Sequence, residues 1–383
     1  MHIEESIPEL SIVMPCLNEA ETVADCVRAA LFFLNRRNIQ GEVVVGDNGS
    51  TDGSQQLAHE AGARVVDVAE RGYGAALIGG INAARSEFII MGDSDGSHDL
   101  KNLDTVYDKL LEGYDLVVGN RFRGKIEENA MPATNRYLGN PFLSYLGRIF
   151  FNSKIGDFHC GLRGFTKKAF KEMDLRTTGM EFASEMIVKS ELFDLSTVEV
   201  PVDMLPSGRS RPPHLRKFKD GWRHLRFLLL YSPRWLFLYP GLFLILMGVI
   251  ISAILLPESV LSLDIHTILY GSAAIIIGMQ GVTFAILIKT FAVQEKLLPE
   301  NPRLKRYLAH ATLEKGIFMG VLIIFLGILG TIYALMLVNS GEFSQMEIPY
   351  TMRIVIPSVT FLATGFQIIF FSFFYSILKL KTR

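Results

Sequence analysis

Four long apolar stretches constrain this chain more than any other feature. They cover roughly residues 235–256, 267–288, 316–338 and 354–378, and the third contains no charged residue. A helix needs about 20 apolar residues to cross a bilayer. One such stretch is also typical of a buried helix in a soluble protein, but four in succession predict a transmembrane domain of four spans over residues 235–383.

The charges of the connecting loops predict the orientation of these spans. The loop between the second and third spans and the C-terminal tail are basic, whereas the other two loops contain acids and neither Lys nor Arg. Lys and Arg collect on the cytoplasmic side of membrane proteins. Residues 1–9 contain three Glu and no basic segment, so we expect no signal peptide. The pattern predicts a multi-pass protein of the plasma (inner) membrane with both termini and the N-terminal half cytoplasmic, although an endoplasmic reticulum membrane would give the same topology.

A basic segment precedes the first span. Residues 209–234 contain eight Arg and Lys and one Asp. Phe218, Trp222, Leu225 and Phe227 are interleaved with these cations, and we expect them to form one apolar face of an amphipathic helix at the lipid interface. The alternative is that some of these cations hold a phosphate substrate.

The N-terminal half, residues 1–208, alternates short apolar runs with polar helical patterns. This alternation predicts an α/β domain with a mostly parallel sheet covered on both faces. Ligands of such sheets bind beyond the carboxyl ends of the strands. The runs predicted as strands are 10–14, 42–47, 64–68, 88–93 and 116–120.

Carboxylates follow two of these predicted strands. Asp93 ends the fourth and Asp95 follows it, within the sequence "IIMGDSDGSHD", and Asp47 ends the second. Carboxylates gathered at the end of a buried strand repel one another unless a cation lies between them, and hard oxygen ligands suit Mg²⁺ or Mn²⁺. The alternatives are a solvated acidic turn for the DxD pattern and a helix cap for Asp47.

Charge and cysteine content exclude other classes of function. The net charge of −1 gives no indication of a nucleic-acid partner. Cys16, Cys26 and Cys160 lack the spacing of metal ligands and suggest reduced thiols in a cytosolic setting.

The ordered motifs resemble a known family. "MPCLNEAETV", "VVVGDNGSTDGS", "RGYGAAL", "GDSDGSHD" and "VVGNRFRG" together resemble family 2 glycosyltransferases of the Rossmann-like GT-A fold. "DFHCGLRGF" and "GMEFASEM" resemble the branch that uses polyprenyl phosphate, which includes dolichyl-phosphate mannose and glucose synthases. The resemblance covers about residues 10–215.

The resemblance implies roles for individual residues. It implies that Asp93 and Asp95 bind Mg²⁺ or Mn²⁺, with Ser97 as a weaker ligand, and that Asp47 reads the base. Asp95, Arg121 and Asp157 are the predicted catalytic residues, and Asp157 either orients the acceptor or an arginine, or caps a loop. The nucleotide-sugar site would comprise Pro15, Leu17, Asn18, Glu19, Asp47, Gly72, Gly74, Asp93 and Ser94, and the acceptor-phosphate site Arg121, Arg136, Asn140, Arg163, Arg209 and Arg211.

The reaction implied is transfer of a hexose, with inversion, from a nucleotide diphosphate sugar to polyprenyl phosphate. UDP-glucose is the first expectation for the donor and GDP-mannose the second. Residues 140–156 are expected at the membrane surface, where they would admit the lipid, or else in the core. A processive polysaccharide synthase is an alternative, but "LYSPRW" lacks the Gln of a Q-x-x-R-W motif. A non-catalytic component of lipid-sugar translocation is a second alternative, and the sequence leaves a homo-oligomer open.

Overall fold

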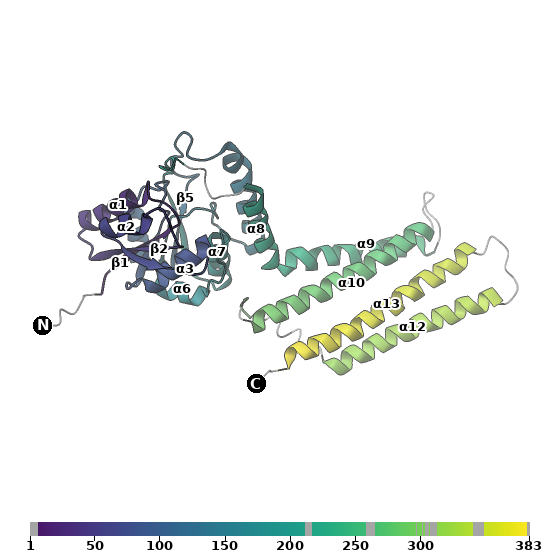
Figure 1. The fold of residues 1–383 in the computed structure, drawn as a ribbon. Helices are drawn as coiled ribbons and strands as arrows, with labels where there is room; N and C mark the ends of the chain where they lie inside the picture. Colours follow the sequence, from purple (N-terminus) through teal and green to yellow (C-terminus); the bar gives the residue numbers. More distant parts are fainter. Residues whose placement is uncertain are drawn as a thin grey trace. The chain divides into compact units, whose positions relative to one another are not determined.

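The computed structural model divides the chain into two units, Met1–Leu228 and Leu229–Arg383. It describes residues 7–210, 217–257, 265–295, 297–300, 302, 306, 312–339 and 348–380. The division falls inside the basic segment 209–234, which the sequence analysis treated as a region of its own. We describe each unit by itself (Figure 1).

The first unit is built on a seven-stranded sheet in the order β3-β2-β1-β4-β6-β5-β7. The pairs β1–β2, β2–β3, β1–β4 and β5–β7 are parallel, and β6 runs antiparallel to both β4 and β5. All five predicted strands are present, whereas β6 and β7 were not predicted. The strands are β1 (Leu10–Cys16), β2 (Gly41–Asp47), β3 (Arg64–Asp67), β4 (Phe88–Met91), β5 (Leu116–Asn120), β6 (Arg163–Thr166) and β7 (Thr197–Pro201).

Amphipathic helices bury one face each against this sheet. In α1 the residues Val23, Val27 and Ala30 recur at helical spacing, and all are buried in one cluster with Ile12 and Val45 of the sheet. This packing holds the strands in place, and with them the loops that follow the strands. The helices of the unit are α1 (Val23–Arg36), α2 (Ser54–Glu60), α3 (Tyr73–Ala83), α4 (Asp104–Leu111), α5 (Asn140–Phe151), α6 (Lys167–Met173), α7 (Phe182–Leu192) and α8 (Lys217–Leu230), with the π-helical turn η1 (Asn135–Gly139) before α5.

Helix α8 differs from the predicted interfacial helix. Trp222 is 59% exposed, but Phe227 is buried together with Asp220, His224 and Leu228. Five residues at 100° each separate Trp222 from Phe227 by about 140° around the helix, so the two cannot share a face. The buried face is polar as well as apolar, since the Ser184 hydroxyl lies 2.8 Å from Nδ1 of His224. The prediction that Phe227 shares one apolar face with Trp222 was therefore wrong. The side chain of Phe218 lies outside the described residues.

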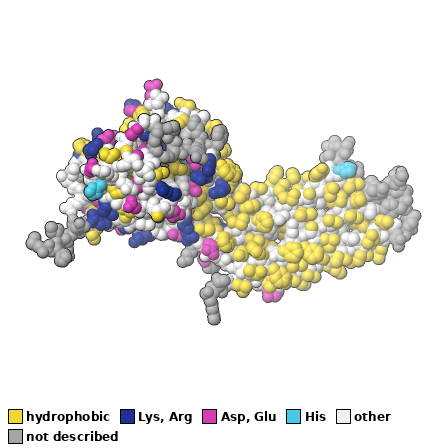
Figure 2. Space-filling view, in the orientation of Figure 1, with side chains coloured by type: hydrophobic (Ala, Val, Ile, Leu, Met, Phe, Trp, Pro, Cys, Tyr) yellow, Lys and Arg dark blue, Asp and Glu magenta, His cyan; other side chains and the backbone are white. Residues whose placement is uncertain are grey.

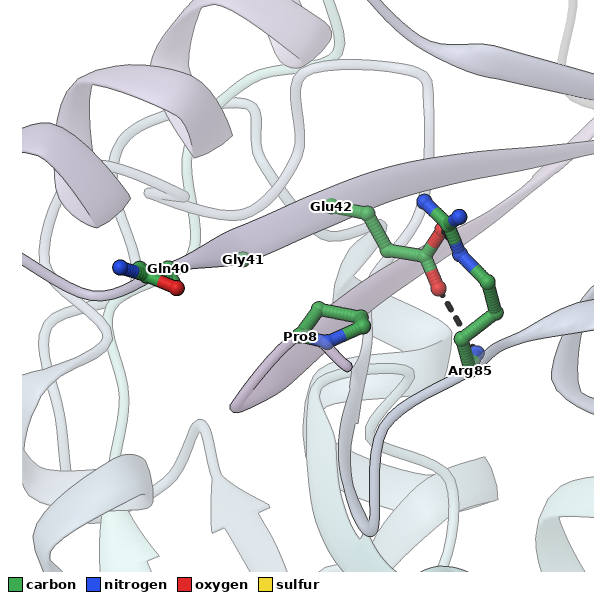
Figure 3. A pocket seen from close by; sticks show the side chains of 5 residues that line it. All are labelled: Pro8, Gln40, Gly41, Glu42 and Arg85. Carbon is green, nitrogen blue, oxygen red and sulfur yellow. Dashed lines mark hydrogen bonds and ion pairs between the residues drawn. The ribbon is translucent and has the colours of Figure 1, made fainter. Parts of the chain in front are cut away.

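A pocket lies at the amino ends of β1 and β2, and Figure 3 shows its lining. Glu42 is buried there and accepts hydrogen bonds from Ser11 (2.8 Å) and from the Arg85 backbone N–H (2.7 Å). Arg64 donates to the same carboxylate at 2.7 Å. The charge of Glu42 is therefore satisfied inside the fold, and the pocket lies at the end of the strands opposite to that at which such sheets bind ligands.

The second unit contains the four predicted spans. Four helices among the described residues are long and apolar enough to cross a membrane: Arg234–Leu255, Ile265–Gln294, Leu313–Val338 and Tyr350–Lys379. Large apolar side chains such as Phe325 and Leu335 are exposed on them, and Figure 2 shows hydrophobic side chains over the surface of these helices. The elements are η2 (Arg234–Leu238), α9 (Tyr239–Leu255), α10 (Ile265–Gln294), α12 (Leu313–Asn339) and α13 (Ile348–Lys379).

Glycines bring the helices of this unit together. A Cβ on Gly248 of α9 would collide with the carbonyl oxygen of Gly271 of α10, and a Cβ on Gly320 of α12 would lie 2.8 Å from the carbonyl oxygen of Gly365 of α13. Small residues allow such close approach in membranes, where packing rather than exclusion of water drives association.

Candidate active site

Two loops at the carboxyl end of the sheet are joined by hydrogen bonds. The parallel pairing of β1 and β2 places Cys16 opposite Asp47, so the loops that follow the two strands leave the sheet side by side. Asn18, in the left-handed conformation at φ 56°, accepts a hydrogen bond from the Thr51 backbone N–H at 2.8 Å. The Glu19 backbone N–H donates to Ser54 Oγ at 2.7 Å. The predicted nucleotide-binding residues of these loops therefore lie in one rigid rim.

Asp47 faces into this rim. Its side chain is buried, and Oδ2 accepts hydrogen bonds from the backbone N–H groups of Gly49 (2.8 Å) and Ser50 (2.9 Å) and from Gln55 (2.6 Å). Burial alone would raise the pKa of Asp47, but the Ser50 and Gln55 hydrogen bonds lower it below its ordinary value. In this structure Asp47 thus shapes the turn. Its role in reading a base stays a prediction, and it requires Asp47 to exchange one of these hydrogen bonds for one from the base.

The carboxylates of Asp93 and Asp95 have different partners. Asp93 Oδ1 accepts a hydrogen bond from the Tyr73 hydroxyl at 2.9 Å, and Oδ2 lies 3.5 Å from Nε2 of His98. Burial alone would raise the pKa of Asp93, but the neighbouring His98 and the Tyr73 hydroxyl lower it. No role was predicted for Tyr73 or His98, although they lie in the motifs "RGYGAAL" and "GDSDGSHD".

Asp95 is paired with a cation from a distant part of the chain. The guanidinium of Arg209 forms an ion pair with Asp95 Oδ2 through Nη2, and its Nη1 lies 3.1 Å from Oε1 of Glu19. The side chains of Arg209, Asp95 and Glu19 are 12%, 13% and 7% exposed. Arg209 was predicted to contact the acceptor phosphate, but here it lies between two predicted donor-site acids. Arg211, which was predicted to contact the same phosphate, lies outside the described residues.

The oxygens around this guanidinium fit a divalent cation. Asp95 and Glu19 are hard oxygen donors that already hold one positive group, and Mg²⁺ usually takes one or two carboxylates and completes its shell with water and substrate phosphates. No group of three or more His, Cys, Asp or Glu side chains within the described ranges is arranged to hold a metal. Asp93 bonds to Tyr73, whereas Asp95 pairs with Arg209. Ser97 contributes its backbone N–H to Asp95 Oδ1 at 2.9 Å.

Arg121 and Asp157 form a buried, bidentate ion pair. Arg121 donates to the carboxylate through Nε (2.7 Å), Nη2 (2.8 Å) and its backbone N–H (3.2 Å), and the two side chains are 9% and 0% exposed. Burial alone would raise the pKa of Asp157, but the charge of Arg121 lowers it below its ordinary value. Of the alternatives for Asp157, the structure shows two together: it orients the side chain of Arg121, and it caps a loop by accepting from the backbone N–H of His159.

Arg163 is the clearest difference from the predicted site. Its guanidinium is fully buried and donates to three backbone carbonyl oxygens, those of Cys160 (2.9 Å), Ala183 (2.6 Å) and Phe158 (2.9 Å). A guanidinium satisfied in this way braces the loop between α5 and β6 and cannot reach a phosphate without unfolding it. The prediction that Arg163 contacts the acceptor was therefore wrong.

The two predicted glycines serve helix packing. Gly72 has φ 139° and a Cβ there would collide with the Thr178 carbonyl oxygen, while a Cβ on Gly74 would collide with the carbonyl oxygen of Thr177. These glycines let α3 approach the segment before α7. Their contact with a nucleotide stays a prediction.

The remaining predicted residues are Pro15, Leu17, Ser94, Arg136 and Asn140. Ser94 donates to the Pro15 carbonyl oxygen at 2.6 Å and so links the loop after β4 to β1, next to the half-buried Leu17. Arg136 of η1 lies over the ring of Tyr137 at 5.6 Å, and Asn140 begins α5.

His159 is a further residue that sequence reasoning missed. It lies in the quoted motif "DFHCGLRGF", its backbone N–H donates to Asp157 at 3.2 Å, and its ring contacts the ring of His224 edge-on at 4.6 Å. Within the described part of the chain neither ring nitrogen of His159 has a hydrogen-bond partner. Burial and then the neighbouring His224 hold the pKa of His159 well below its ordinary value.

Comparisons with known proteins show which family this chain resembles. The family described as "Glycosyl transferase family 2" matches residues 11–174, and "Glycosyltransferase family 2 C-terminal transmembrane region" matches residues 286–379. The low-salt glycan biosynthesis hexosyltransferase Agl6 of Haloferax volcanii is 34% identical over 373 residues, which cover 96% of this chain and 88% of that protein.

The chain belongs to glycosyltransferase family 2. It is therefore a glycosyltransferase with a GT-A fold and a C-terminal membrane region. The dolichyl-phosphate hexose transferase of Haloferax volcanii is 25% identical over 200 residues, 52% of this chain and 84% of that protein. A crystal structure of glucosyl-3-phosphoglycerate synthase from Mycobacterium tuberculosis, in complex with Mn²⁺, UDP and glucosyl-3-phosphoglycerate, has a TM-score of 0.44 and 20% identity over 58% of this chain and 78% of that one. This last likeness is too distant to assign a ligand to the enzyme described here.

Proposed function

We propose that this glycosyltransferase moves a hexose from a nucleotide diphosphate sugar to polyprenyl phosphate. The observation that carries the choice of a lipid acceptor is an apolar surface on η1 and α5. Tyr137, Leu138, Phe142 and Tyr145 are all exposed there, whereas the opposite face of α5 is buried in the domain. Exposed aromatic and aliphatic side chains of this kind suit a lipid surface. The name of the dolichyl-phosphate hexose transferase supports the same class of acceptor.

The reaction needs positioned cations more than a strong base. An oxygen of the acceptor phosphate forms a bond to the anomeric carbon as the bond from that carbon to the diphosphate breaks, and the nucleotide diphosphate leaves. A phosphate with a second pKa near 6 is largely ionised at pH 7, so no proton must be removed from the nucleophile. A single displacement of this kind inverts the anomeric centre.

The residues fall into a donor side and an acceptor side. Asp95, with Glu19 beside it, would hold Mg²⁺ or Mn²⁺, which when bound neutralises charge on the leaving diphosphate. Arg121 would contact the acceptor phosphate, in an orientation fixed by Asp157, because bidentate pairing leaves one guanidinium nitrogen for a second partner. Arg136 of η1 and Asn140 of α5, on the elements that carry the exposed apolar surface, would also contact the acceptor phosphate.

The donor proposal keeps UDP-glucose first and GDP-mannose second. The rim formed by the loops after β1 and β2 would receive the nucleotide. Asn18 and Ser94 support it through hydrogen bonds to backbone atoms, namely those of Thr51 and Pro15.

Sugar transfer by the purified full-length protein tests this function. The protein in detergent receives polyprenyl phosphate and radiolabelled UDP- and GDP-sugars, with Mg²⁺ or with EDTA. We expect metal-dependent label in the lipid phase from one donor, and its loss in Asp95→Asn. Asp99→Asn is the matched control, since Asp99 caps a turn in the same loop (3.1 Å to the Lys101 N–H). Label in a polymer would support the processive alternative, and no label with any donor would contradict the proposal.

We also propose that the catalytic domain and both termini are cytoplasmic. The orientation follows from the basic loop between α10 and α12. Single cysteines at Lys315 and His266, at the starts of α12 and α10, would react with a membrane-impermeant maleimide from opposite sides of sealed vesicles. The native cysteines are buried, and burial raises the pKa of Cys160 to about 12, so they should stay silent. Labelling of Lys315→Cys from the non-cytoplasmic side of the membrane would contradict the orientation.

A further inference from the structure

A short segment closes over the donor side of the site. Residues 204–210, called the strap here, follow β7 and bond to the loop after β4. The Leu205 backbone N–H donates to the Ser97 carbonyl oxygen at 2.9 Å, and the Gly208 N–H donates to the Asp95 carbonyl oxygen at 3.0 Å. Ser210 then bonds to Glu21, before α1, through its backbone N–H at 2.6 Å and its hydroxyl at 2.5 Å. The strap thus bridges two of the loops that form the donor site.

The strap carries the guanidinium that lies between Asp95 and Glu19. Ser207 Oγ accepts a hydrogen bond from Nε of Arg209 at 2.9 Å, so the side chain is held at its base as well as at its tip. Both carboxylates are nearly buried, which weakens screening by solvent and makes the positive charge between them important. A guanidinium and a divalent cation cannot use the same carboxylate oxygens at once.

We propose that Arg209 is a displaceable counter-ion for the donor site. Before the metal binds, its single positive charge offsets part of the negative charge of Asp95 and Glu19 and keeps the strap closed. Binding of a divalent cation with a nucleotide diphosphate releases the guanidinium and opens the strap. This inference rests on the proposed function, since it takes Asp95 as the residue that holds the metal. It makes Arg209 a gating residue, whose first partner is the enzyme's own acids and not the acceptor phosphate.

The energetic consequence concerns metal affinity. The metal must first displace the guanidinium. The apparent affinity for the metal is therefore the intrinsic affinity multiplied by the fraction of molecules in which the strap is open. Removing the guanidinium removes that penalty and takes away the positive charge that Arg209 places between the two acids. A tenfold change in affinity corresponds to about 1.4 kcal/mol of binding free energy.

Binding of Mn²⁺ alone, measured by electron paramagnetic resonance on the full-length protein in detergent, tests the proposal. We expect Arg209→Gln to bind Mn²⁺ about tenfold more tightly than the wild type. Arg28→Gln is the matched control, because Arg28 pairs with Asp25 on the exposed face of α1, and it should bind as the wild type does. Equal or weaker affinity in Arg209→Gln, or no Mn²⁺ binding by either protein, would overturn the proposal. The titration contains neither sugar nor lipid, so its result is independent of whether transfer to polyprenyl phosphate is found.

A disulfide that locks the strap provides the second test. A Cβ built on Gly208 lies 3.0 Å from Cγ2 of Thr22 in the segment before α1, which is close enough for Thr22→Cys/Gly208→Cys to form a bond with little movement. Bond formation is verified by intact mass after alkylation. We expect the oxidised protein to bind Mn²⁺ with UDP at least about tenfold more weakly than the same protein after reduction. Equal binding by the two forms would show that the strap need not move.

Discussion

Asp157→Asn is the substitution for which the structure gives the largest expected effect. The change removes the negative charge that faces Arg121 but keeps the shape of the side chain and one oxygen, which can accept from the backbone N–H of Arg121 or of His159 but not from both. Arg121 is 9% exposed and Asp157 is fully buried, so water cannot replace the lost charge. Breaking such a pair on one side costs about 3–5 kcal/mol. For a unit the size of Met1–Leu228 this corresponds to a fall in melting temperature of roughly 6–20 °C.

The assay is thermal unfolding of the full-length protein in detergent, followed by circular dichroism. Asp174→Asn is the matched control, because Asp174 is 57% exposed in its pair with Arg176 and its loss should cost less than about 1 kcal/mol. The double variant Arg121→Met/Asp157→Asn should recover most of the stability, since no unpaired charge stays buried, but it should not recover sugar transfer. A single variant as stable as the control, or a double variant no more stable than the single one, would refute this account of the pair.

Two further predictions concern stability. Burial lowers the pKa of His224 from 6.5 to about 4, so the unfolded chain takes up the proton first and stability should fall as the pH drops from about 6.5 to about 4. His224→Gln should flatten that part of a melting-temperature profile while His59→Gln does not, and equal slopes would contradict the assignment. Gly72→Ala should destabilise the domain by about 1–3 kcal/mol because of its φ of 139° and the collision with the Thr178 carbonyl oxygen. Gly53→Ala, also at positive φ but with nothing within 4 Å of the new Cβ, should cost less, and the opposite order of melting temperatures would refute the packing argument.

The sequence predicted where strands and membrane spans lie better than it predicted what they pack against. Periodicity and loop charge are local signals, and they placed the five parallel strands and the four spans within a few residues. The antiparallel strand β6 was missed because "RGFT" is too short and too polar to read as a strand; only its place between β4 and β5 makes it one. In α8 the list of apolar residues was misleading, because it does not say which of them share a face. The angle between Trp222 and Phe227 around the helix places these two on different faces.

The site shows the same limit for charged residues. Motif spacing predicted which acids gather at the carboxyl end of the sheet, because parallel strands bring their ends together. It could not predict which cation meets which acid, since Arg209 is 114 residues from Asp95 along the chain and Arg121 is 36 residues from Asp157. For the same reason Arg163 was grouped with the other arginines, although its three carbonyl partners give it a structural role.

The two paired arginines of the site differ in what could replace them. Asp157 is fully buried behind Arg121 and binds it through two side-chain nitrogens, so a metal would have to enter the core to compete for that carboxylate. Arg121 is therefore a permanent charge, suited to a phosphate that arrives in every cycle. Asp95 and Glu19 lie instead at the end of the sheet where substrates of this fold bind, and their guanidinium comes from a segment held by a few loop hydrogen bonds. Weak attachment by loop hydrogen bonds suits a charge that must leave when the metal binds, so Arg209→Gln should strengthen metal binding. The Arg121–Asp157 pair is instead part of the core, so the loss of Asp157 should weaken the fold.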